Sequence, residues 1–318
     1  MKKLILLLLM IPLLVLVNCK KDEDDPTTPT GDDPYKILTE YMVNNDMDLP
    51  DILDGWITAP PLAIDEVDAF LAPYDIIDIR VANDFDAGHI EGALNATLGT
   101  LLDVAATTTK PILVVCYTGQ TAGHATVALR LSGFEAKVLK WGMSGWNSNN
   151  SDPWANSIGD AAVGHTNWVT TATVPVVEFN DPVLTGTDGA TILEAQVADM
   201  LAEGFQGVVN TTVLDDPSVY YINNYWDQID VDHYGHIDLA YRVKPLSIEN
   251  GEMENIDPSK TVVTYCWTGQ TSSMVTAYLN VIGYNAVSLK FGTNGMIYSV
   301  LESHKFVTPT VDLPVVTE

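Results

Sequence analysis

One six-residue segment occurs twice in this chain of 318 residues and limits what the chain can fold into. Residues 116–121 read CYTGQT and residues 266–271 read CWTGQT, so five of the six positions are identical. Further matches occur in the same order in both copies. One lies before the segment, at 88–90 and 235–237, and two lie after it, at 131–134 and 281–284 and at 139–142 and 289–292. An ordered set of matches indicates two structural units of the same kind, each long enough to bury a core of its own.

The pattern around each repeated cysteine is that of an α/β unit. We expect a strand, a helix and a second strand at 112–115, 122–131 and 136–139, and again at 261–265, 272–281 and 286–289. Gly133 and Gly283 stand where a glycine would end each helix. Because strands that alternate with helices pair in parallel, the sequence predicts two domains, each a parallel sheet flanked by helices.

Composition divides the chain further. We expect a lipoprotein signal peptide at 1–18, an acidic flexible tether at 19–34, a first domain at 35–150, an inter-domain connection at 151–188 and a second domain at 189–318. The connection is assigned because much of it is rich in Asn, Ser, Thr, Gly and Pro, which favour loops.

The N-terminal residues have the pattern of an export signal. Lys2 and Lys3 precede an apolar run at 4–17, which is too short to span a bilayer comfortably and ends just before Cys19. This end resembles the lipobox of bacterial lipoproteins, in which Cys19 would carry the lipid; an ordinary signal peptide or a weak membrane anchor is the alternative. The acidic run that follows resembles a surface-export signal of such lipoproteins, or is a solvated spacer. We therefore expect a protein of the cell envelope, at the outer membrane, that contacts the membrane through its lipid anchor only.

The charge balance excludes one class of partner. The chain has 42 Asp and Glu residues against 15 Lys and Arg residues, which gives a net charge of −27. Nucleic acid is not an expected partner, because phosphate recognition needs clustered cations.

Each repeated loop places a cysteine between the end of a strand and the start of a helix. Loop N–H groups and the positive end of the helix favour a thiolate, which predicts a lowered thiol pKa and a cradle for a persulfide or an anion. The substrate-binding loops would comprise Tyr117, Thr118, Gly119, Gln120 and Thr121, and Trp267, Thr268, Gly269, Gln270 and Thr271. The alternative is that Cys116 and Cys266 are small buried apolar residues. Equivalent points in separate domains are expected to lie too far apart for a disulfide, so both thiols should be free.

The first copy resembles a rhodanese domain over residues 50–146. The resemblance rests on Asp78, Arg80, Phe85, Gly88, His89, Ile90, Gly92, Ala93, Asn95, the loop at 116–121 and the segment 139–146. It implies a sulfurtransferase whose nucleophiles are Cys116 and Cys266. Each would take a sulfane sulfur from a small sulfur-containing substrate and pass it, through a persulfide, to a thiol or other nucleophilic acceptor, without a metal or an organic cofactor. Six-residue loops are typical of the sulfurtransferases and seven-residue loops of related phosphatases, and the absence of Arg and Lys from both loops argues against a preference for thiosulfate.

The second copy departs from the family pattern where Asp78 and Arg80 stand in the first, because residues 221–226 read YINNYW. The resemblance implies structural support, rather than chemistry, for Asp78, Arg80, His89 and His236. We therefore expect Cys116 to have the lower thiol pKa and the larger share of sulfur transfer. The alternative function is a non-catalytic, surface-tethered module that binds a small anion or a protein partner.

Overall fold

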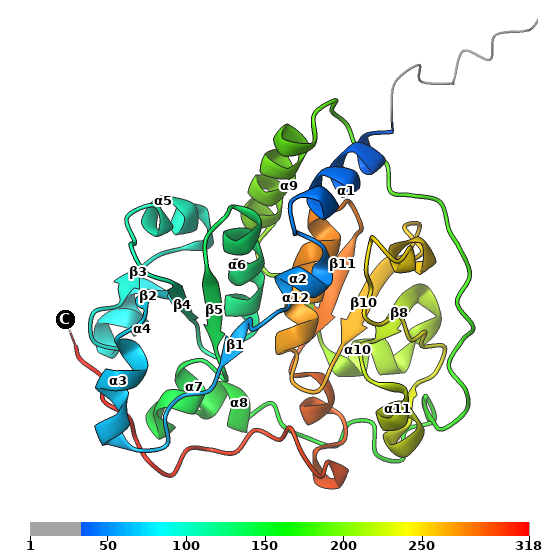
Figure 1. Ribbon diagram of the computed structural model, residues 1–318. Helices are drawn as coiled ribbons and strands as arrows, with labels where there is room; N and C mark the ends of the chain where they lie inside the picture. Colours follow the sequence, from blue (N-terminus) through cyan, green and yellow to red (C-terminus); the bar gives the residue numbers. More distant parts are fainter. Residues whose placement is uncertain (1–32, 318) are drawn as a thin grey trace, which may run out of the picture. The chain divides into compact units, whose positions relative to one another are not determined.

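The computed structural model describes residues 33–317 and shows an α/β protein with two parallel sheets flanked by helices, as the sequence predicts (Figure 1). Residues 1–32, which include Cys19, the expected signal peptide and most of the expected tether, lie outside the described residues.

The two parallel sheets share the order of four strands, and the first sheet has a fifth strand at one edge. The first runs β1-β5-β4-β2-β3, with strands β1 (Ile57–Thr58), β2 (Asp75–Asp78), β3 (Leu94–Asn95), β4 (Ile112–Val115) and β5 (Ala136–Leu139). The second runs β7-β11-β10-β8, with strands β7 (Gly207–Val208), β8 (Tyr220–Asn224), β10 (Thr261–Tyr265) and β11 (Ala286–Leu289). In the first sheet, β4 leads into Cys116 and lies between β5 and β2. In the second, β10 leads into Cys266 and lies between β11 and β8. In the second half, β9 (His236–Ile237) pairs antiparallel with β6 (Trp168–Val169) instead of joining the parallel sheet.

Helices connect and cover these strands (Figure 1). They are α1 (Pro34–Asn44), α2 (Leu49–Ile52), α3 (Val67–Leu71), α4 (Ala82–Ala87), α5 (Leu101–Ala105), α6 (Gln120–Leu131), α7 (Met143–Trp146), α8 (Asp152–Ala155), α9 (Gly189–Glu203), α10 (Asn210–Asp215), α11 (Gln228–Tyr234) and α12 (Gln270–Val281). Short 3-10 turns occur at Ile64–Glu66, Leu98–Thr100, Ser148–Asn150, Pro217–Val219, Glu252–Asn255, Gly292–Gly295 and Tyr298–Val300. Within residues 33–317 no helix is both long and apolar enough to cross a membrane.

The predicted elements around each cysteine are confirmed. All four predicted strands have the predicted bounds, and the helices α6 and α12 begin two residues earlier than expected, at Gln120 and Gln270. Gly133 and Gly283 follow these helices with φ of 87° and 95°, a left-handed conformation that only glycine adopts without strain.

Helices α6 and α12 pack against each other between the two sheets (Figure 1). Gly123 in α6 permits this close approach, because a Cβ atom there would overlap the side chain of Ser273 in α12. One continuous apolar cluster extends across this contact, from Val114 and Leu129 in the first half to Val262 and Leu279 in the second. The helices that begin at the two cysteine loops are therefore held together by a shared core.

The ends of the described chain also join the two halves. Near the start, the Asp48 carboxylate accepts hydrogen bonds from the Ser247 hydroxyl (2.6 Å) and from the Ile248 N–H (2.9 Å) of the second half. Near the end, His89 and Val316 exchange backbone hydrogen bonds of 3.0 and 2.9 Å. Each end is thus attached to the half of the chain that lies farther away in sequence.

Candidate functional site

The first loop places the sulfur of Cys116 in front of backbone N–H groups. Cys116 follows β4, and its Sγ accepts hydrogen bonds from the N–H of Gly119 (3.1 Å) and of Ala122 (3.3 Å). Gly119 lies in the left-handed region at φ 82°, which turns the loop into the first residue of α6. The arrangement is the cradle of N–H donors at a helix N-terminus that the sequence predicts.

Burial raises the pKa of the Cys116 thiol, although the N–H groups of Ala122, Thr118 and Gly119 oppose this effect. The negative charge of Asp78 raises the pKa further. The prediction of a lowered thiol pKa at Cys116 is therefore wrong. The physical reason is that only 2% of this residue is exposed, so that desolvation of the thiolate outweighs its hydrogen bonds.

The second loop has a related but different sulfur environment. Cys266 follows β10, is also 2% exposed, and accepts a hydrogen bond from the Ser272 N–H at 3.3 Å. The Ser272 hydroxyl lies 3.6 Å from this sulfur and 2.8 Å from the hydroxyl of Ser288. Ala122 stands where Ser272 does in the repeat, so the sequence already distinguishes the two sites. Both cysteines are free thiols in the structure.

The loop residues divide into a buried inner set and a mouth. The inner set comprises Thr118, Gly119, Gln120, Thr268, Gly269 and Gln270, while Tyr117, Thr121, Trp267 and Thr271 are half-buried. At the first mouth, the Tyr117 hydroxyl donates to the Asp84 carboxylate. At the second, the Trp267 ring stacks between Trp226 and His304, with ring centroids 4.1 and 4.8 Å away.

The two loops contact each other, a feature that the sequence alone did not indicate. The Gln270 side-chain amide donates to the Thr118 carbonyl at 2.8 Å, and the Gln120 side-chain oxygen accepts from the Phe291 N–H at 2.8 Å. The repeat indicated that the loops are equivalent, but it carried no signal that their glutamines reach across to the other half.

An aromatic cluster lies beside this contact. Trp154 is fully buried and packs edge-on against Trp141 and Phe291, with ring centroids 4.9 and 5.0 Å away, and stacks on Phe306 at 5.1 Å. Trp141 and Phe291 occupy equivalent positions in the repeat, and both have positive φ, of 68° and 61°. Such a conformation costs a non-glycine residue about 1–3 kcal/mol, so the surrounding packing must hold it. Trp154 comes from the segment expected to be a connection, and no sequence motif marked it.

Asp78 and Arg80 form a buried ion pair beneath the first loop. The Arg80 Nε and a terminal nitrogen donate to the Asp78 carboxylate at 3.0 and 2.6 Å, and the same terminal nitrogen donates to the Gly88 carbonyl at 2.7 Å. By strand register, Asn224 and Trp226 take these two positions in the second half. In the described part of the chain, neither the Asn224 side chain nor the Trp226 indole N–H has a hydrogen-bond partner.

The two histidines predicted to be structural contact backbone carbonyls. His89 Nδ1 lies 2.9 Å from the Phe85 carbonyl, and its ring stacks on that of Phe85 at 3.8 Å. His236 Nδ1 and Nε2 lie 2.8 and 2.7 Å from the carbonyls of Ile237 and Thr171. Hydrogen bonds of this kind fix the backbone of loops, and all the partners of the two rings are backbone carbonyls rather than a cysteine sulfur.

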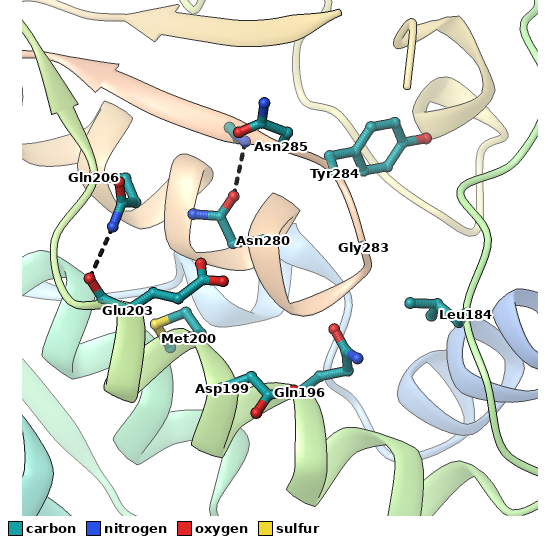
Figure 2. Close-up of a pocket in the computed structure, with 11 residues that line it drawn as sticks. Leu184, Gln196, Asp199, Met200, Glu203, Gln206, Asn280, Gly283, Tyr284 and Asn285 are labelled. Carbon is teal, nitrogen blue, oxygen red and sulfur yellow. Dashed lines mark hydrogen bonds between the residues drawn. The ribbon is translucent and has the colours of Figure 1, made fainter. Parts of the chain in front are cut away.

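Two cavities bear on where a substrate approaches. One of about 420 Å³ opens beside Tyr117 and is bordered by Asp84, Asn147 and Asp152, so its polar groups are acidic or neutral apart from the paired Arg80. Another of about 580 Å³ lies between α9 and the C-terminal end of α12, away from the Cys266 loop at the start of that helix (Figure 2). None of its lining residues belongs to a cysteine loop, whereas Tyr117 of the Cys116 loop lines the first cavity, which is therefore the better candidate for substrate access.

Comparison with known proteins places the chain in a family. The family model described as "Rhodanese-like domain" matches residues 63–149. The thiosulfate sulfurtransferase GlpE of Shewanella oneidensis is 37% identical over 79 residues, which cover 24% of this chain and 78% of that protein. The chain therefore belongs to the rhodanese family, and this relationship supports a sulfurtransferase-type function.

The solved structures that match parts of this chain include a sulfurtransferase and a rhodanese-like domain protein. The thiosulfate sulfurtransferase of Pseudomonas aeruginosa has 15% identity and a TM-score of 0.29, over 87% of this chain and 49% of that one. The rhodanese-like domain protein of Staphylococcus aureus has 22% identity and a TM-score of 0.25, over 28% of this chain and 91% of that one.

Proposed function

We propose that the protein is a sulfurtransferase or persulfide carrier that moves sulfane sulfur through Cys116 and Cys266. The observation that carries this proposal is the Cys116 sulfur held by the N–H groups of Gly119 and Ala122 at the N-terminus of α6. Such donors stabilise a thiolate, and they would equally stabilise the terminal charge of a persulfide.

The proposed reaction has two displacements. The cysteine thiol loses its proton to water, and the thiolate attacks the outer sulfur of a donor persulfide or polysulfide. A sulfur–sulfur bond forms at the cysteine, the donor's sulfur–sulfur bond breaks, and the donor leaves as a thiolate. An acceptor thiolate then attacks the outer sulfur of the enzyme persulfide, which restores the cysteine thiolate. No net oxidation occurs, because one sulfur–sulfur bond replaces another.

The electrostatics of the first loop favour donors other than thiosulfate. Neither loop contains Lys or Arg, and the cavity beside Tyr117 is bordered by Asp84 and Asp152. A dianion would be repelled there, whereas a neutral or singly charged sulfur donor would be repelled less.

The second half is proposed to be a second domain of the same family. The support is the shared strand order, the equivalent cysteine loop and the matching α6 and α12. On this proposal the first domain covers 35–150, the connection 151–188 and the second domain 189–318.

The test is a sulfur-transfer assay with polysulfide as donor and a small thiol as acceptor. We expect donor-dependent transfer that is lost when Cys116→Ser and Cys266→Ser are combined, with each single variant showing what its cysteine contributes. Transfer by the double variant equal to that of the wild type would contradict the proposal.

A non-catalytic binding module is the second candidate function, and the burial of both cysteines favours it. Thiols that resist alkylation at every pH at which the protein stays folded would support the module. Thiols that react would support the sulfurtransferase.

We also propose that Cys19 carries a lipid anchor and that the protein resides at the outer membrane. The support is the apolar run that ends at this cysteine. Mass spectrometry of the protein isolated from membranes should show acyl chains on Cys19, and Cys19→Ser should abolish them. A native protein without lipid on Cys19 would contradict this assignment.

A further inference from the structure

One peptide group in the first loop is held on both sides. The N–H of the Thr118–Gly119 peptide donates to the Cys116 sulfur at 3.1 Å. The carbonyl oxygen of the same peptide accepts two hydrogen bonds, from the Gln270 side-chain amide at 2.8 Å and from the Trp154 indole N–H at 3.0 Å. Neither of these donors belongs to the first loop, and Gln270 lies in the second.

We propose that Gln270 and Trp154 are positioning residues for Cys116, through which the second half of the chain aims a hydrogen-bond donor at the nucleophile of the first half. The inference deepens the proposed function in that it takes Cys116 as a nucleophile. The geometry on which it rests does not depend on which sulfur compound is the substrate.

The planarity of the peptide bond transmits the effect. Because the carbonyl and N–H of one peptide are rigidly opposed, fixing the Thr118 carbonyl also fixes the direction of the Gly119 N–H. Gly119 is at φ 82° and has no Cβ atom to restrict its backbone, so the contacts of the Thr118 carbonyl must hold the orientation of the peptide. Two donors on the carbonyl also polarise the peptide, which strengthens its N–H as a donor to sulfur.

Burial makes these hydrogen bonds effective. Trp154 is fully buried and Gln270 is 1% exposed, so bulk water has little access to replace them. Rotation of the peptide would leave buried donors unpaired, which is unfavourable. The second loop and the aromatic cluster therefore keep the first loop in the orientation that places the N–H on the sulfur.

The second loop positions the first, but the first loop does not position the second in the same way. Gln120 is the equivalent of Gln270 in the repeat, but its side-chain oxygen accepts from the Phe291 N–H at 2.8 Å, and its nitrogen donates within its own loop to the Thr118 hydroxyl at 3.2 Å. The Cys266 sulfur accepts from the Ser272 N–H instead. Removal of Gln270 should therefore alter Cys116 selectively.

The test uses the full-length protein and iodoacetamide, with alkylation of Cys116 and Cys266 quantified separately by peptide mass spectrometry over a range of pH. Gln270→Met keeps the side-chain length without the amide, and Trp154→Phe keeps an aromatic ring without the N–H. In each variant we expect the Cys116 profile to move to higher pH and its rate constant at neutral pH to fall about fivefold, as for loss of one hydrogen bond. The Cys266 profile should stay where it is in Trp154→Phe and should shift less than the Cys116 profile in Gln270→Met, and Gln120→Met is the matched control, with a smaller effect on Cys116.

An unchanged Cys116 profile in both variants would overturn the inference, and so would equal shifts at both cysteines, since those would mean general loosening. If Gln270→Met fails to fold, Trp154→Phe decides the question. Alkylation needs no sulfur transfer, so a shifted Cys116 profile in a protein that never forms a persulfide would uphold this inference while refuting the proposed function.

Discussion

Replacing Arg80 by methionine should be among the most damaging single changes in the first half. The substitution keeps a long apolar side chain but removes the guanidinium that neutralises Asp78. Asp78 is fully buried, and without the guanidinium only the backbone N–H of residue 80, at 3.0 Å, would donate to its carboxylate. Breaking a buried ion pair by removing one partner typically costs about 3–5 kcal/mol, and we expect a loss of that order in the free energy of unfolding.

The assay is equilibrium unfolding in urea, followed by tryptophan fluorescence. The matched control is the double variant Asp78→Asn/Arg80→Met, which also removes the unpaired carboxylate. Asparagine is chosen because Asn224 occupies the equivalent position in the second half. We expect this double variant to be more stable than Arg80→Met alone. An Arg80→Met protein within about 1 kcal/mol of the wild type would refute the reasoning, because the pair would then behave like an exposed one. A double variant no more stable than the single one would also refute it.

Three further perturbations test other parts of the account. Burial lowers the pKa of His124 to about 4, so the folded state binds fewer protons than the unfolded state at mildly acidic pH. The contribution of His124 to the free energy of unfolding should therefore be fully present above pH ~6.5 and should decline by up to about 3 kcal/mol as the pH falls towards 4. His124→Met introduces the residue that the second copy has at this position, Met274, and should flatten the decline in urea titrations at several pH values. Gly142→Ala should lower stability and slow Cys116 alkylation, because Gly142 has φ 59° and a Cβ atom there would overlap the Cys116 carbonyl; wild-type alkylation would contradict this. Cys116→Ser should remove more sulfur transfer than Cys266→Ser, because two N–H groups hold the Cys116 sulfur, and the reverse ranking would show that the second half dominates.

Local structure around the cysteines could be predicted from the sequence because short-range signals agreed there. The apolar run at 112–115 is buried along its whole length in β4, as expected for a central parallel strand. Gly133 ends α6 as predicted, because the left-handed turn requires glycine. The repeat then gave the same elements for the second half without a separate argument.

Features that depend on distant contacts could not be predicted. Trp154 and Phe306 stack on each other although they are far apart in the sequence, and no periodicity marks either residue. The direction of the Cys116 pKa shift was predicted wrongly because it depends on how deeply the loop is buried. The loop pattern alone shows the N–H donors that lower the pKa, whereas the desolvation that raises it comes from the packing of the rest of the chain around the loop.

The most direct test of the central claim is mass spectrometry of the intact protein and its peptides after exposure to polysulfide. We expect the mass of one added sulfur atom on the peptide that contains Cys116 and on the peptide that contains Cys266, with Cys116 the more extensively modified. The added sulfur should disappear when a thiol acceptor is supplied. Absence of added sulfur from both cysteines, or sulfur that no acceptor removes, would contradict the assignment of these loops as sites of sulfur transfer.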